Sequence, residues 1–102
     1  MKIIKCLAEN IEEELHDADE YIELAMKWKQ EEFDTAQVFY ELSTEEMGHV
    51  DKLHKEVTEL INDYRTQHGE PPKEMLTLYE YLHQKHIGRA TEIKVKQAMF
   101  QA

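Results

Sequence analysis

The spacing of apolar residues near the start of the chain is the feature that most limits its fold. Over positions 4–25 they alternate by four and three, at Ile4, Ala8, Ile11, Leu15, Ala18, Ile22 and Ala25. Such heptad spacing is typical of a helix that packs one stripe against a second helix. Only three glycines and two prolines interrupt the 102 residues, so the helices can be long. The pattern predicts an all-α protein.

The breaks in this pattern divide the chain into three predicted helices. The first is expected over residues 2–30. Asp34 can cap a second helix, and Gly69 is placed to end it. Pro71 or Pro72 falls in the first turn of a third helix, expected over residues 73–100. Residues 1–102 then form one domain, an antiparallel hairpin with a third helix. It is either a three-helix bundle or a four-helix bundle completed by dimerisation.

Charge limits the classes of partner. The chain has 22 acidic and 12 basic residues, and residues 1–46 alone hold 14 acids and four bases. Nucleic acids and anionic membranes are therefore excluded as partners, because both are bound through Lys and Arg. The acidic first helix is either a solvated face or a docking surface for a basic protein partner.

Cysteine content and the lack of apolar runs bear on location. Cys6 is the only cysteine, which excludes a disulfide framework and a Cys-x-x-Cys motif. Helical phase places it on the polar side of the first helix, and a free thiol suits a reducing compartment. No signal peptide is visible, and no apolar run approaches the ~20 residues of a membrane span. We therefore expect a cytoplasmic protein.

A repeated pair of residue types points to metal chemistry. Three Glu-x-x-His pairs occur, at Glu13/His16, Glu46/His49 and Glu80/His83. Side chains three residues apart on a helix are neighbours and can reach one ion. Glu46 also falls on the apolar face of the second helix, where an unpaired carboxylate is costly. Bound iron or manganese would pair with it.

Helical phase selects further candidate ligands. On the first helix Glu13 points away from the apolar stripe, whereas Glu14 lies nearer to it, so Glu14 is the better inward ligand. On the third helix His83 and His86 both face inward. The candidate metal ligands are Glu14, Glu46, His49, His83 and His86. No catalytic residue and no phosphate-binding loop for an organic cofactor is identifiable.

The second predicted helix, through Phe39, Ser43, Glu45-Glu46-Met47 and His49, resembles that of rubrerythrin and other ferritin-like di-iron carboxylate proteins. The resemblance covers roughly residues 7–60. Counting back from Glu46 by the spacing of that family gives Glu13, and a connection one residue shorter gives Glu14. A ferritin-like domain has four main helices, so this chain corresponds to a half-length member.

The resemblance implies a di-iron or manganese site with ferroxidase or peroxide-reducing activity, which would make the protein an oxidoreductase. Two copies of Glu14, Glu46 and His49 in a homodimer or higher homo-oligomer would supply four carboxylates and two imidazoles. Alternatively, His83 and His86 would close a site within one chain. A different class of function also fits the sequence: a non-enzymatic acidic helical adaptor that binds no metal.

Overall fold

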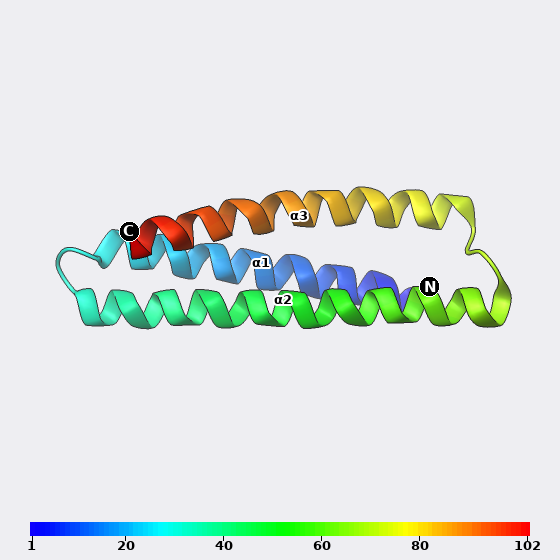
Figure 1. Cartoon of the computed structure of the whole chain (residues 1–102), viewed down its shortest axis with the longest axis horizontal. Helices are drawn as coiled ribbons and strands as arrows, with labels where there is room; N and C mark the ends of the chain where they lie inside the picture. Colours follow the sequence, from blue (N-terminus) through cyan, green and yellow to red (C-terminus); the bar gives the residue numbers. More distant parts are fainter.

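Three long helices lie side by side in a rod that measures 56 × 19 × 17 Å (Figure 1). The computed structural model describes residues 1–102 and contains α1 (Lys2–Trp28), α2 (Phe33–His68) and α3 (Lys73–Gln101). Short connections make α2 antiparallel to both α1 and α3 (Figure 1). The predicted all-α fold, with three helices in one bundle, is confirmed.

The α1–α2 hairpin contains most of the core. Six of the seven residues of the predicted α1 stripe are buried, and Ala8 is half-buried. They meet a complementary stripe on α2, formed by Ala36, Met47, Val50, Val57 and Ile61. Burying a side chain the size of Leu or Ile contributes about 1.5–3 kcal/mol. The heptad stripe of α1 is therefore buried against α2, as its spacing predicts.

Helix α3 is anchored mainly through its C-terminal half. Ile93 and Phe100 are buried against the hairpin, and the ring of Phe100 stacks on Tyr40 at 5.1 Å between centroids. Gln97 Nε2 donates a hydrogen bond to Ser43 Oγ at 2.9 Å, and Ser43 Oγ donates to the carbonyl of Ala18 at 2.7 Å. This chain of hydrogen bonds crosses all three helices.

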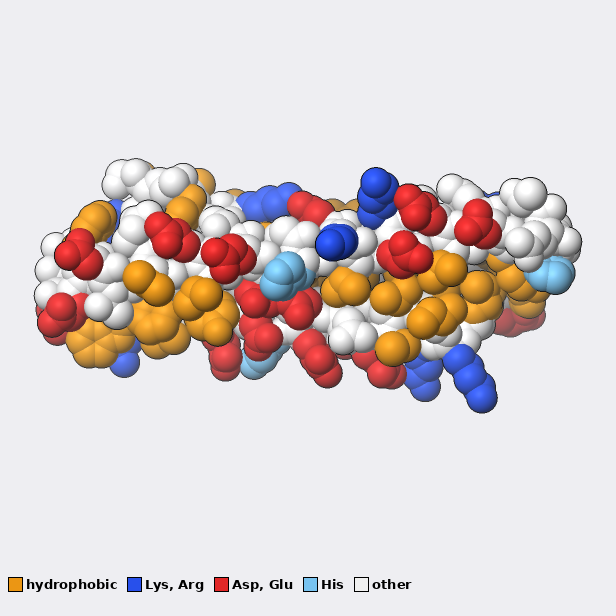
Figure 2. Space-filling view, turned by 90° about the horizontal axis from the view of Figure 1, so that it is seen from below, with side chains coloured by type: hydrophobic (Ala, Val, Ile, Leu, Met, Phe, Trp, Pro, Cys, Tyr) orange, Lys and Arg blue, Asp and Glu red, His pale blue; other side chains and the backbone are white.

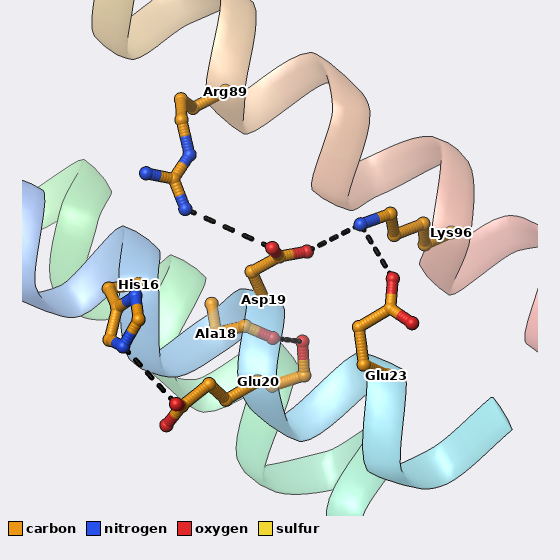
Figure 3. A network of polar contacts seen from close by, with 8 residues as sticks. His16, Ala18, Asp19, Glu20, Glu23, Arg89 and Lys96 are labelled. Carbon is orange, nitrogen blue, oxygen red and sulfur yellow. Dashed lines mark hydrogen bonds and ion pairs between the residues drawn. The ribbon is translucent and has the colours of Figure 1, made fainter. Parts of the chain in front are cut away.

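A cationic side chain from α3 also binds the acidic face of α1. Lys96 Nζ lies 2.7 Å from both Asp19 Oδ1 and Glu23 Oε1, and Arg89 Nη2 lies 3.9 Å from Asp19 Oδ2 (Figure 3). The contacts with Asp19 and Glu23 raise the pKa of Lys96. Part of the negative charge of α1 is thus neutralised within the chain.

The helix boundaries differ slightly from those predicted. Helix α1 ends at Trp28 rather than near residue 30, and α2 begins at Phe33, before the predicted cap Asp34. Asp34 lies in the first turn instead, where its charge is favourable to the helix dipole. Gly69 ends α2 as predicted: its φ is 80°, and its N–H donates to the carbonyl of Arg65.

Cys6 is exposed, on the side of α1 that its helical phase indicated. None of the three helices contains an apolar stretch long enough to cross a lipid bilayer.

Candidate metal centre

Glu14 on α1 meets Glu46 and His49 near the middle of the α1–α2 hairpin. His49 Nδ1 lies 3.1 Å from Glu14 Oε2 and 3.7 Å from Glu46 Oε2. One ligand atom from each of the three side chains lies within 4.8 Å of the others. This is the only group of three or more His, Cys, Asp or Glu residues in the chain with that geometry. The antiparallel register of α1 and α2 brings these three side chains together.

A second, half-buried heptad stripe carries the two glutamates. On α1 it contains Leu7, Glu14 and Tyr21, and on α2 it contains Phe39, Glu46, Leu53 and Leu60. Residues seven apart lie on the same helix face. The side chain of Glu46 is only 19% exposed and that of Glu14 only 27%. Each helix therefore interrupts an apolar stripe with one carboxylate at the same level of the rod.

This stripe lies on a face of the hairpin that α3 does not cover. None of the polar contacts of Glu14, Glu46 or His49 reaches α3. Seen from the α2 side, acidic and histidine side chains gather in the middle of the surface, between two groups of hydrophobic side chains (Figure 2). Along each helix, half-buried apolar residues flank Glu14 and Glu46 on both sides, so the two carboxylates lie within a partly exposed apolar surface.

The two carboxyl groups compete for one proton. A hydrogen bond to Glu14, reinforced by burial, raises the pKa of Glu46 to about 7, and the same hydrogen bond lowers the pKa of Glu14. The hydrogen bond from His49 to Glu14 raises the pKa of His49. At neutral pH the cluster therefore retains protons because like charges are crowded. A bound cation would relieve the same repulsion.

The donor set fits a hard or borderline divalent ion. Carboxylate oxygens suit Mn²⁺ and iron, and an imidazole nitrogen suits iron as well. Three protein ligands leave coordination positions free for solvent or for further ligands. The combination of a Glu on one helix with Glu-x-x-His on its neighbour is half of the ligand set of a carboxylate-bridged di-metal site.

The other predicted site residues lie elsewhere. Glu13 is exposed and lines a separate cavity with His16, so it is Glu14 that faces His49. His83 contacts His54, with 2.8 Å between Nδ1 and Nε2. His86 is buried, and its Nε2 lies 3.5 Å from Glu12. The structure therefore does not bring His83 or His86 to the cluster of Glu14, Glu46 and His49.

Sequence reasoning missed one pairing. The sequence places His54 on the inward face of α2, but nothing in it shows that His54 is opposite His83. The partner depends on the relative register of α2 and α3. These helices are linked by residues 69–72, and no local motif specifies how they slide past one another. The resulting imidazole pair could be found only in three dimensions.

Comparisons with protein-family models, with curated proteins and with solved structures found no match to this chain. Any function must therefore be inferred from the residues and their geometry. The strongest functional feature is the group of two carboxylates and one imidazole on the uncovered face of the hairpin.

Proposed function

We propose that the chain is a ferritin-like protein that binds iron or manganese through Glu14, Glu46 and His49. The observation that carries this proposal is the convergence of three ligand atoms from two helices within 4.8 Å. Both carboxylates are partly buried within apolar stripes, which makes their negative charge more costly than on an open surface. The convergence of these groups from two helices supports a metal site over a solvated acidic surface.

The proposal includes a second copy of the chain. The stripes around Glu14 and Glu46 are only half-buried, and α3 covers a different side of the hairpin. Two hairpins packed through this face would form a four-helix bundle with Leu7, Tyr21, Phe39, Leu53 and Leu60 in its interior. The same packing would bring two sets of ligands together, giving four carboxylates and two imidazoles. The dimer would thus complete both the apolar core and the metal site.

The expected reaction is oxidation of Fe(II) by oxygen or peroxide. A pair of bound irons would supply the electrons, and their open coordination positions would admit the oxidant. Glu14 and Glu46 contribute negative charge, which favours the more highly charged ion. Glu46 and His49 must release the protons that the metal replaces. A four-cysteine iron site could deliver electrons for repeated peroxide reduction, but this chain has a single cysteine. Repeated turnover would therefore need an external reductant.

The proposal is tested by titrating metal-free protein with Fe(II) under argon and then admitting air. We expect saturation at one iron per chain, followed by fast oxidation seen in the near-ultraviolet. Glu46→Ala should abolish both. Glu45→Ala is the matched control, because Glu45 is the exposed neighbour of Glu46. Absence of saturable binding, or equal behaviour of the two variants, would reject the metal function and leave a non-enzymatic adaptor that binds a partner through the acidic face of α1.

The shared site makes a separate prediction about assembly. Sedimentation should detect a dimer, and Leu53→Lys should convert it to monomers and weaken iron binding. Leu78→Lys is the control, because Leu78 is an exposed leucine on α3, away from the proposed interface. Two irons per chain bound by a monomer would show that the site is not shared.

A further inference from the structure

A pair of histidines joins α2 to α3 away from the Glu14–Glu46–His49 cluster. His54 Nε2 and His83 Nδ1 are 2.8 Å apart, and the two rings stack with 4.4 Å between centroids. Tyr79 also stacks on His83, with 5.8 Å between ring centroids. Both histidines are half-buried. Their positions are therefore fixed by packing and by a direct contact between the helices.

The pair lies in the wall of a cavity between α2 and α3 that is widely open to solvent. This cavity has a volume of about 790 Å³ and is also lined by Thr58, Tyr79 and Glu80. Glu80 is the only carboxylate in the lining, and its Oε1 accepts a hydrogen bond from Gln84. The two imidazoles thus have room beside them for an ion and its water ligands.

We propose that His54 and His83 form a second metal site, which takes Zn²⁺, an ion of borderline softness, and bridges α2 and α3. Neutral imidazole is a preferred ligand of such ions. Two nitrogens bound to one tetrahedral zinc, each about 2.0–2.1 Å from it, would be about 3.3 Å apart. The observed 2.8 Å contact is a hydrogen bond between stacked rings, so the ion would replace its proton, and the rings would turn until both nitrogens point at the ion.

The site differs from the Glu14–Glu46–His49 cluster in both chemistry and consequence. Its ligands are two nitrogens, with the remaining positions open to water or to Glu80, whereas the first cluster offers two carboxylates and one imidazole. The C-terminal half of α3 is already held by Lys96, Gln97 and Phe100. An ion on His54 and His83 would fasten the N-terminal half of α3, in which His86 is the only buried residue.

The test uses a Glu46→Ala/His49→Ala variant, in which only Glu14 of the first cluster remains. Calorimetric titration with Zn²⁺ should still show one saturable equivalent per chain. Adding His54→Gln or His83→Gln should remove it, whereas adding His68→Gln should not. His68 is the control because it is an exposed histidine at the end of the same helix as His54. Circular dichroism confirms that each variant is folded.

Amide hydrogen exchange provides a second readout. Zn²⁺ should slow exchange in residues 73–84 of the double variant and leave them unchanged once His54→Gln is added. Zn²⁺ binding that survives both histidine substitutions, or absence of binding to the double variant, would overturn the proposal. The proposed iron site is tested separately, because His54→Gln in the otherwise unchanged chain should leave Fe(II) binding at one equivalent.

Discussion

Replacing Glu46 with glutamine should stabilise the metal-free protein while destroying its metal binding. In the folded chain the pKa of Glu46 is raised from its usual 4.5 to about 7, chiefly because it shares a proton with Glu14. Below pH 4.5 Glu46 is protonated in both the folded and the unfolded chain, so its raised pKa does not change the free energy of unfolding. Between pH 4.5 and 7 the folded chain binds more protons, so the free energy of unfolding falls as pH rises. Glutamine removes the charge that causes this loss.

The size of the effect follows from the pKa values. At about 1.4 kcal/mol for each unit of pKa, raising the pKa of Glu46 to about 7 destabilises the fold by at most about 3 kcal/mol above pH 7. The lowered pKa of Glu14 arises from the same hydrogen bond and contributes stability above pH 4.5, which offsets part of this loss. Contact of the cluster with solvent reduces the destabilisation further. We expect Glu46→Gln to add about 1–2 kcal/mol at pH 8 and almost nothing at pH 4.

The assay is urea denaturation with a chelator at pH 4 and pH 8, with Glu45→Gln as the exposed control. In a second series without chelator, Fe(II) added under argon should stabilise the wild type, because an ion that binds only the folded state raises its stability, and should not stabilise Glu46→Gln. A destabilising effect of Glu46→Gln at pH 8, or the same gain at both pH values, would refute this account of the cluster.

Three further substitutions test the packing that positions the site. Leu15→Ala should cost about 3 kcal/mol in urea denaturation, because Leu15 is 1% exposed in the hairpin core; a loss below 1 kcal/mol would contradict that packing. Ser43→Ala should cost about 1–2 kcal/mol, since it removes hydrogen bonds to Ala18 and Gln97; an unchanged melting curve would contradict this. Lys96→Met should cost about 1 kcal/mol at low salt and much less in 1 M NaCl. Equal losses at both salt concentrations would indicate that the ion pairs contribute little.

The fold could be predicted because its determinants are local. Heptad spacing identified the buried stripe of α1, and Gly69 marked the end of α2 through a backbone conformation that side chains disfavour. The same holds for part of the site. Glu46 and His49 are neighbours on any helix that contains them, because three residues make almost one turn. The start of α2 was harder to predict from Asp34, since several residues near position 33 could begin the helix. The packing of Phe33 against Phe100 also influences where α2 begins.

What the sequence alone determined was the helical content, the core stripe of the hairpin and the pairing of Glu46 with His49, all of which follow from helix periodicity. The tertiary structure decided which residues of different helices meet. It brought Glu14, which helical phase already favoured over Glu13, beside His49, and it directed His83 to His54. A displacement of one helix by a single residue would rotate the contacting face by 100°. Such register depends on packing along the whole rod, so no short motif in the sequence could specify it.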